Sequence, residues 1–281
     1  MSLRYTEVDV FTDTLTLGNP VAVVHGADGL SDETMAAFAR WTNLSETTFL
    51  LAPTDPAADY RVRIWTPGGE LPFAGHPTLG SARAWLADGG VPREAGVVVQ
   101  ECAVGLVPIR VPEDGAPLAF AAPPLRQSGP ADEATRDLVV RSLKVDPARV
   151  RAVEWADNGP GWVVALLESA ADVLGLDPDF GAMGDQHVGA VGPHAAGGPA
   201  DVEVRAFVPG LGISEDPVTG SLAGGLGMWL PTTGVVGDDF VIRQGTALGR
   251  RGMVRITREG GRVWVGGDTV LAVTGEVAIS R

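Results

Sequence analysis

Two stretches rich in small residues constrain the fold of this chain more than any other feature. Each follows a polar residue and a proline, His76-Pro77 in the first half of the chain and Asp216-Pro217 in the second. The small residues are Gly80, Ser81, Ala82 and Ala84 in the first stretch and Ala223, Gly224, Gly225 and Gly227 in the second. A glycine inside a helix costs about 1 kcal/mol relative to alanine, so exposed helices of this composition would be poorly stable. The composition therefore predicts two enclosed central helices, each wrapped by a curved sheet.

The two Xaa-Pro pairs predict where these helices begin. Proline is favoured at the first helical position, so both prolines are expected there, with His76 and Asp216 as the preceding N-cap residues. The free N–H groups of a first helical turn, together with the helix dipole, receive carboxylates or phosphates. Gly75 and Gly220 would let the backbone approach such a ligand closely, and both are candidate substrate-binding residues.

Other motifs occur once in each half of the chain. The pair Val62-Arg63 returns as Val204-Arg205, and Gly18-Asn19-Pro20 before an apolar strand resembles Gly159-Pro160-Gly161. This common order of strand, turn and Xaa-Pro segment predicts two pseudo-symmetric lobes. Proline-rich stretches around the middle of the chain predict the boundary, with residues 1–117 in the first lobe and residues 118–271 in the second.

Local patterns place several chemically capable side chains. Residues 47–51 are typical of a strand, which leaves Glu46 at its entrance. Cys102 is expected to be a small buried residue on a strand, and Glu101 beside it is a candidate to face a ligand. His187 and His194 fall in a glycine-rich stretch and are expected to be exposed bystanders.

The composition excludes several classes of partner. The 281-residue chain has a formal charge of −14, which argues against nucleic acid because phosphate binding relies on clustered Lys and Arg. No apolar run is long enough to span a bilayer and no secretory signal opens the chain, so no membrane partner and a cytoplasmic location are expected. One cysteine and four histidines without paired spacing predict no metal site. The single cysteine also excludes a racemase that needs a thiol on each face of one carbon.

Four motifs in order resemble the PhzF family, the phenazine-biosynthesis isomerases and their relatives. They are Gly18-Asn19-Pro20, Ser45-Glu46-Thr47-Thr48-Phe49, Leu71-Pro72-Phe73-Ala74-Gly75-His76-Pro77-Thr78 and Glu215-Asp216-Pro217-Val218-Thr219-Gly220-Ser221. The resemblance implies the diaminopimelate-epimerase-like fold, an α+β fold of two lobes, each a curved mixed or antiparallel sheet around a central helix. It also implies that the active site lies in the cleft between the lobes and that residues 272–281 return to the first lobe. A homodimer without cofactor is expected on the same ground.

The resemblance assigns roles residue by residue. Glu46 matches the family's catalytic glutamate, and His76 and Asp216 match its substrate-positioning histidine and aspartate. Gly220 and Ser221 match the pair that holds the ligand. In the phenazine isomerase one base moves a proton between two ring carbons of trans-2,3-dihydro-3-hydroxyanthranilate, on one face of the ring. The same role here requires that burial raise the pKa of Glu46 so that it serves near neutral pH.

The resemblance leaves the substrate of this chain open. The stretch Leu222–Trp229 departs from the alanine-rich pattern of phenazine-type sequences, so a small carboxylate is expected as substrate without further identity. Two alternatives remain: an epimerase of another small acid that uses Glu46 with a different second group, and a catalytically silent binding protein of the same fold. Solvent deuterium at one substrate carbon or at two would separate the epimerase from the allylic isomerase.

Overall fold

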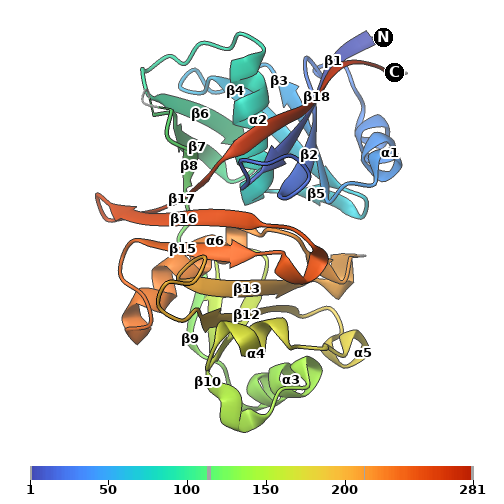
Figure 1. Ribbon diagram of the computed structural model, residues 1–281. Helices are drawn as coiled ribbons and strands as arrows, with labels where there is room; N and C mark the ends of the chain where they lie inside the picture. The colour runs from blue at the N-terminus through green and yellow to red at the C-terminus, as the bar shows by residue number, and fades with distance from the viewer. Residues whose placement is uncertain (1, 113–114, 212, 280–281) are drawn as a thin grey trace. The chain divides into compact units, whose positions relative to one another are not determined.

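The computed structural model of the protein describes residues 2–112, 115–211 and 213–279. Contacts divide the chain into two compact units (Figure 1). Unit 1 comprises Met1–Ala121 and Gly266–Arg281, and unit 2 comprises Ala122–Val265. The sequence predicts that the chain passes from the first unit to the second after residue 117 and returns after about residue 271. The contacts place these two boundaries after residues 121 and 265.

Unit 1 contains one mixed sheet. Its strands are β1 (Ser2–Val10), β2 (Asn19–Val24), β3 (Glu46–Leu51), β4 (Tyr60–Thr66), β5 (Gly69–Leu71), β6 (Val97–Cys102), β7 (Gly105–Arg110), β8 (Leu118–Ala121) and β18 (Thr269–Ala278). They pair in the order β18, β1, β2, β3, β4, β6, β7 and β8, and the short β5 pairs with β4 beside β6. The parallel pairs are β2 with β3 and β4 with β6, and a helix lies in the chain between the members of each pair.

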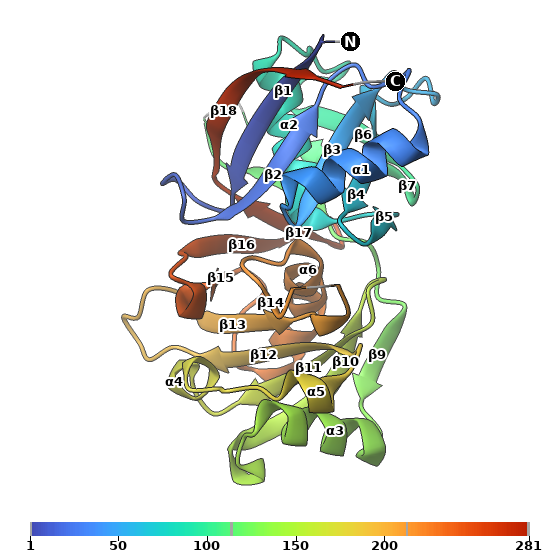
Figure 2. The ribbon, with the colours of Figure 1, turned by 90° about the vertical axis from the view of Figure 1, so that its right-hand side faces the viewer.

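The two helices of unit 1 cover opposite faces of β3. On α1 (Asp32–Thr42), Met35 and Ala39 belong to a buried cluster with Phe49 of β3. The hydroxyl of Ser81 on α2 (Gly75–Ala87) donates to the hydroxyl of Thr48 at 2.9 Å. Because successive strand residues face opposite sides of a sheet, α1 and α2 lie on opposite faces, as Figure 2 shows.

The small residues of α2 allow the sheet to approach it closely. This helix contacts β1, β2, β3, β6, β8 and β18. A Cβ atom added at Gly80 would lie 2.2 Å from Cγ1 of Val21, which is closer than side chains pack. The helix is therefore enclosed, as its composition predicts.

Unit 2 repeats the strand order of unit 1. Its strands are β9 (Gln127–Pro130), β10 (Val150–Asp157), β11 (Trp162–Leu167), β12 (His187–Pro193), β13 (Val202–Phe207), β14 (Glu215–Asp216), β15 (Phe240–Gln244) and β16 (Gly252–Glu259), and β17 (Arg262–Gly267) crosses the boundary between the units. They pair in the order β9, β10, β11, β12, β13, β15 and β16, with β14 on β13. The parallel pairs are β11 with β12 and β13 with β15, the counterparts of β2 with β3 and β4 with β6.

A buried layer on one face of this sheet holds the outer helices. These are α3 (Glu133–Leu143), α4 (Ala170–Leu174) and α5 (Phe180–Met183), and short 3₁₀ turns are η1 (Pro147–Arg149), η2 (Pro209–Leu211), η3 (Leu230–Thr233) and η4 (Thr246–Leu248). Val139 of α3, Val173 of α4 and Met183 of α5 are in one cluster with strand residues such as Val163 and Val188. Removal of this apolar surface from water stabilises the unit.

The central helix of unit 2 is α6 (Gly220–Trp229). It contacts β10 and β16. A Cβ atom at Gly225 would lie 2.1 Å from the carbonyl oxygen of Ala156, and one at Gly227 would lie 2.7 Å from Cγ1 of Val263. Glycine is thus required because strands pack directly on this helix, and the prediction of two enclosed helices is confirmed.

The predicted start of α2 is wrong by two residues. Ala74 is the N-cap, and His76 and Pro77 are the second and third residues of the helix. Proline is tolerated there because the first N–H groups of a helix have no intrahelical partner. His76 is consequently a helical residue that is 3% exposed and not a cap.

The predicted start of α6 is also wrong. Asp216 ends β14, where it pairs with Ala206, and Thr219 is the N-cap. Pro217 lies between strand and helix, where it has no ladder hydrogen bond to lose. In the part of the chain that the structure describes, no helix is long and apolar enough to cross a membrane.

Candidate functional site

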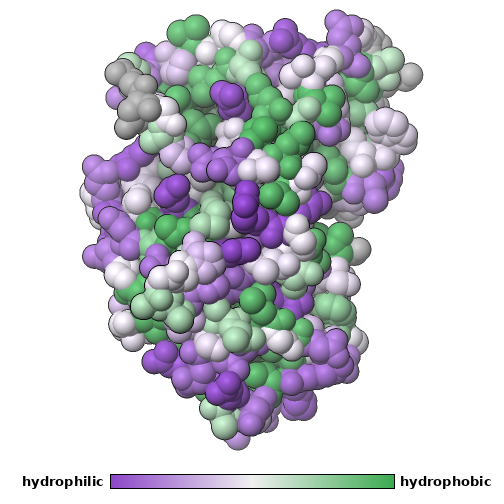
Figure 3. All heavy atoms as spheres, viewed as in Figure 1, coloured by the Kyte–Doolittle hydropathy of each residue, from purple (hydrophilic) through white to green (hydrophobic). Residues whose placement is uncertain are grey.

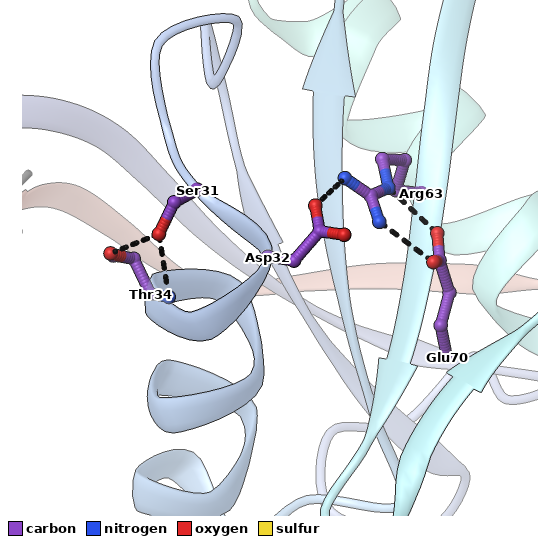
Figure 4. Close-up of polar contacts among 5 residues, drawn as sticks. All are labelled: Ser31, Asp32, Thr34, Arg63 and Glu70. Atoms are coloured by element: carbon purple, nitrogen blue, oxygen red, sulfur yellow. Dashed lines mark hydrogen bonds and ion pairs between the residues drawn. The ribbon is translucent and has the colours of Figure 1, made fainter.

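The N-termini of the two central helices differ from those of the outer helices. Side chains cap the outer helices by accepting first-turn N–H groups: Ser31 for α1, Asp132 for α3, Ser169 for α4 and Asp179 for α5. Figure 4 shows the cap of α1, where Oγ of Ser31 accepts the N–H of Thr34 at 3.3 Å. The N-caps of α2 and α6 make no such side-chain bond among the described residues. The first-turn N–H groups of both central helices therefore remain for another acceptor.

Glu46 is positioned by the parallel pair of β2 and β3. It is the first residue of β3 and pairs with Val21, so it enters the sheet next to Asn19 and Pro20, the first two residues of β2. Thr47 and Thr48, which follow it, are fully buried. The side chain of Glu46 itself is 13% exposed. The strand start thus holds a carboxylate at the margin of the core, as the sequence predicts.

His76 lies directly against this carboxylate. Its Nε2 is 3.2 Å from Oε2 of Glu46, and its Nδ1 is 3.3 Å from Nδ2 of Asn19. Burial lowers the pKa of His76 to about 3, while the nearby Pro20 carbonyl opposes that shift. The imidazole is consequently neutral at neutral pH, and its contact with Glu46 is not an ion pair between full charges.

The amide of Asn19 favours one tautomer of His76. When Nδ2 of Asn19 donates to Nδ1 of His76, the ring proton is on Nε2 and faces Glu46. The sequence shows Asn19 only as part of a turn motif, because it does not reveal that the side chain of Asn19 contacts a ring nitrogen of His76.

In unit 2, Asp216 is tied to the start of α6. Its Oδ2 accepts the hydroxyl of Thr219 at 2.6 Å. Nε2 of Gln244 donates to the hydroxyl of Thr219 at 2.9 Å and to the Asp216 carbonyl at 3.0 Å, and its Oε1 accepts the Thr219 N–H at 3.0 Å. Gln244 is 1% exposed and comes from β15. The fold therefore fixes Asp216 through a buried amide that the sequence reasoning missed.

Ser221 is the second residue of α6 and is held by the first residue of β11 and by the residue that follows β10. Nε1 of Trp162 donates to its hydroxyl at 3.0 Å, and Nδ2 of Asn158 donates to its carbonyl at 2.9 Å. Gly220 precedes it as the first residue of the helix and is buried. The sequence motif identified this pair, but Trp162 and Asn158 lie about sixty residues away in the chain, and no spacing rule links them to Ser221.

Two of the expectations about other polar residues are wrong. His187 is not an exposed loop residue but the first residue of β12, and it is half-buried. His194 lies 3.0 Å from the buried carboxylate of Glu203. His187 is positioned by strand pairing, which the glycine-rich composition of the segment concealed. His194 lies in the loop after β12, as expected, but its contact with Glu203 keeps it from being exposed.

Glu101 and Cys102 border a cavity of about 250 Å³ away from Glu46 and His76. The carboxylate of Glu101 accepts hydrogen bonds from the backbone N–H groups of Thr54 and Asp55 and from the Thr54 hydroxyl, so it stabilises that turn. Burial raises the pKa of the Cys102 thiol, which disfavours a reactive thiolate. This cavity shares no lining residue with the predicted site.

Comparison with known proteins identifies the family. The model of the family described as phenazine biosynthesis-like protein, PhzC-PhzF, matches residues 8–276. A trans-2,3-dihydro-3-hydroxyanthranilate isomerase from Pseudomonas aeruginosa is 36% identical over 92% of this chain and 91% of its own. The protein Antisense-enhancing sequence 1 of Schizosaccharomyces pombe is 34% identical over 97% of both chains.

A solved structure gives the same result for the fold. The PhzF-family phenazine biosynthesis protein of Enterococcus faecalis superimposes with a TM-score of 0.82 at 25% identity, covering 99% of this chain and 100% of that one. The predicted fold class, an α+β diaminopimelate-epimerase-like fold, is thereby confirmed. The chain belongs to the phenazine biosynthesis-like (PhzC-PhzF) protein family, whose full-length relatives include isomerases.

Proposed function

We propose that the protein is a cofactor-independent isomerase that moves a proton between carbons of a small unsaturated carboxylate, with Glu46 as the single base. The observation that carries the proposal is the 3.2 Å contact of Glu46 with the neutral, buried His76 at the uncapped end of α2. Relatives named trans-2,3-dihydro-3-hydroxyanthranilate isomerase support this class of substrate. A cyclic amino- or hydroxy-carboxylate with a ring double bond fits the same chemistry.

In the proposed reaction, Glu46 removes a proton from a substrate carbon and becomes a neutral carboxylic acid. The electron pair of that C–H bond delocalises through the adjacent double bond, so negative charge develops away from the first carbon. Glu46 then returns the proton to the other end of the delocalised system, and the charge balance is restored. His76, with its proton on Nε2, hydrogen-bonds the carboxylate or the reacting group while remaining uncharged.

We assign the binding of the substrate to unit 2. The uncapped N–H groups of α6, from Gly220 onward, suit a carboxylate, and the hydroxyl of Ser221 offers a further hydrogen bond. Asp216, held by Thr219 and Gln244, would position an amino or hydroxyl group of the substrate.

The experiment follows turnover of trans-2,3-dihydro-3-hydroxyanthranilate in D₂O by proton NMR. The proposal predicts a shifted double bond whose new C–H position carries the proton from the original carbon, with deuterium there only to the extent that protonated Glu46 exchanges with solvent before it returns the proton. It also predicts a loss of about 10²–10⁴-fold in kcat for Glu46→Gln. Glutamine keeps the shape and a hydrogen-bonding oxygen but accepts no proton. Full turnover by this variant would eliminate the one-base scheme, and deuterium at the original carbon without a bond shift would indicate an epimerase.

We further propose that the protein is a homodimer. Hydrophobic residues reach the surface of unit 1 on the face shown in Figure 3. Trp41 is 75% exposed and stacks on Phe38, with ring centroids 5.6 Å apart, and Val273 on β18 is 45% exposed. We take these exposed apolar side chains as the candidate dimer contact. Light scattering during size exclusion should give twice the 29.1 kDa chain mass, and a single-chain mass at micromolar concentration would contradict the proposal.

A further inference from the structure

Two equivalent ion pairs allow residues of the two units to be matched. In unit 1, Nε and Nη2 of Arg63 each donate at 2.7 Å to one oxygen of Glu70, as Figure 4 shows. In unit 2, Nε and Nη2 of Arg205 donate to the two oxygens of Glu215 at 3.0 and 2.7 Å. Each arginine also lies over the aromatic ring two residues later, Trp65 at 5.3 Å and Phe207 at 5.0 Å. Arg63 and Arg205 therefore occupy equivalent places.

The strand registers extend this match to the candidate base. Trp65 pairs with Thr47, the residue after Glu46, and Phe207 pairs with Val188, the residue after His187. The parallel pairs agree independently, because Val21 pairs with Glu46 and Trp162 pairs with His187. His187 consequently stands in unit 2 where Glu46 stands in unit 1.

The surroundings of His187 connect it to Ser221. Its ring lies 5.3 Å from the ring of Trp162, at an interplanar angle of 45°. Nε1 of Trp162 donates to Oγ of Ser221 at 3.0 Å, and Trp162 is only 2% exposed. In unit 1 the strand-start residue Glu46 contacts His76 of the central helix directly. In unit 2 the strand-start residue His187 contacts Trp162, whose indole in turn contacts Ser221 of the central helix.

We propose that His187 and Trp162 are positioning residues of the substrate-binding half of the site. His187 fixes the indole of Trp162, and Trp162 holds the hydroxyl of Ser221 in the rotamer that receives the substrate. The inference rests on the proposed binding role of Ser221. It gives a role to His187, a titratable residue at the place equivalent to Glu46. The charge of His187 controls substrate binding and does not take part in proton transfer from carbon.

The charges around His187 give this arrangement a pH dependence. Burial lowers the pKa of His187, while the Pro160 carbonyl, Asp157 and Asp185 oppose the shift. The neutral ring packs on Trp162 at neutral pH. Protonation at lower pH draws the ring toward Asp157 and Asp185 and disturbs its contact with the indole, so substrate binding weakens on the acid side.

The first experiment needs no substrate. The indole ¹H–¹⁵N resonance of Trp162 is assigned by its absence in Trp162→Phe, and its shift is followed from pH 8 down to the lowest pH at which the protein remains folded. It should move with pH through a single titration, lose that movement in His187→Phe, and change position at all pH values in Ser221→Ala. A resonance that does not titrate, or that titrates equally in His187→Phe, overturns the role of His187.

The second experiment measures kcat and KM, together with the affinity for 3-hydroxyanthranilate, an aromatic analogue of the dihydro acid. Trp162→Phe should raise KM about tenfold with kcat changed less than twofold, because one hydrogen bond that positions the binding group is lost. The double variant Trp162→Phe/Ser221→Ala should bind no more weakly than Ser221→Ala alone. Trp155→Phe, in the partly buried layer against the outer helices, is the matched control and should leave KM unchanged.

These outcomes separate the inference from the proposed function. If Glu46→Gln is inactive and Trp162→Phe has a normal KM, or if the effects of Trp162→Phe and Ser221→Ala add, the inference is wrong and the isomerase proposal stands. If Glu46→Gln retains turnover, the isomerase proposal fails, and the indole titration still decides the inference. His187→Phe keeps an aromatic ring but cannot be protonated, so it should lack the rise in KM that the natural protein shows at acid pH.

Discussion

The two units share a strand order but differ in what they place at the tip of the central helix. Unit 1 brings a carboxylate against a buried neutral imidazole, Glu46 against His76. Unit 2 brings a hydroxyl and a tethered carboxylate to the equivalent tip, Ser221 and Asp216, each held by a buried partner. In our proposal the copy of the fold in unit 1 carries out proton transfer and the copy in unit 2 binds the ligand, because different side chains stand at the equivalent strand starts and helix starts.

A second comparison separates the central helices from the outer ones. The outer helices satisfy their first-turn N–H groups with their own Ser or Asp caps, and the central helices do not. A missing cap costs about 1 kcal/mol, so the sequence accepts a loss of stability at the two places where an anionic ligand would replace the cap.

The largest difference between the units is expected in the free energy of unfolding that is lost when the arginine of each Arg–Glu pair is replaced. The side chains of Arg205 and Glu215 are 9% and 6% exposed, whereas those of Arg63 and Glu70 are 24% and 37% exposed. Arg205→Met should lower the free energy of unfolding by about 3–5 kcal/mol, because it leaves a buried carboxylate uncompensated. Arg63→Met should cost about 0–1 kcal/mol, as exposed pairs do. Urea denaturation of both variants measures these free energies. Equal losses would contradict the expectation that the more buried ion pair contributes more to stability.

An intermediate effect is expected for the contribution of His76 to the pH dependence of stability. The pKa of His76 is about 3 in the folded protein and 6.5 in the unfolded chain, so the unfolded chain binds the additional proton between these values. The stability that the neutral ring contributes is present above pH 6.5 and falls as pH drops toward 3, by up to about 1.4 kcal/mol per pH unit. His76→Gln should flatten the curve of unfolding free energy against pH in this range. Parallel curves for the two proteins would show that His76 titrates normally.

The smallest effect is expected from adding a cap to α2. Ala74→Ser places a hydroxyl where it can accept the N–H of His76, because Pro77 at the next position has no N–H to offer. This variant should gain about 0.5–1 kcal/mol of stability and lose affinity for the substrate a few-fold, because the N–H of His76 is then satisfied by the cap. The reference variant Ser31→Ala, at the cap of α1, should lose about 1 kcal/mol without any change in KM. A cap at residue 74 that leaves KM unaltered would exclude this helix start from ligand binding.

The sequence predicted those features that are local or periodic. The glycine content of the α6 segment indicated an enclosed helix, and Ser31 before two acids indicated the start of α1. The contact partners Asn19, Gln244 and Trp162 could not be predicted, because strand registers bring them to the helix starts from distant parts of the chain. The misplaced helix starts have a related cause: proline is compatible with the first turn and with the preceding loop, so it does not mark one position. His187 was misjudged because the glycines after it belong to a strand and not to a loop.

The most direct measurement of the division between the units compares kcat and KM of Glu46→Gln and Ser221→Ala under the same conditions. The account predicts that Glu46→Gln loses about 10²–10⁴-fold in kcat with KM within a few-fold of the natural protein. It predicts that Ser221→Ala raises KM about tenfold with kcat nearly unchanged. Substantial turnover in Glu46→Gln, or a loss confined to kcat in both variants, would contradict the assignment of chemistry to unit 1 and binding to unit 2.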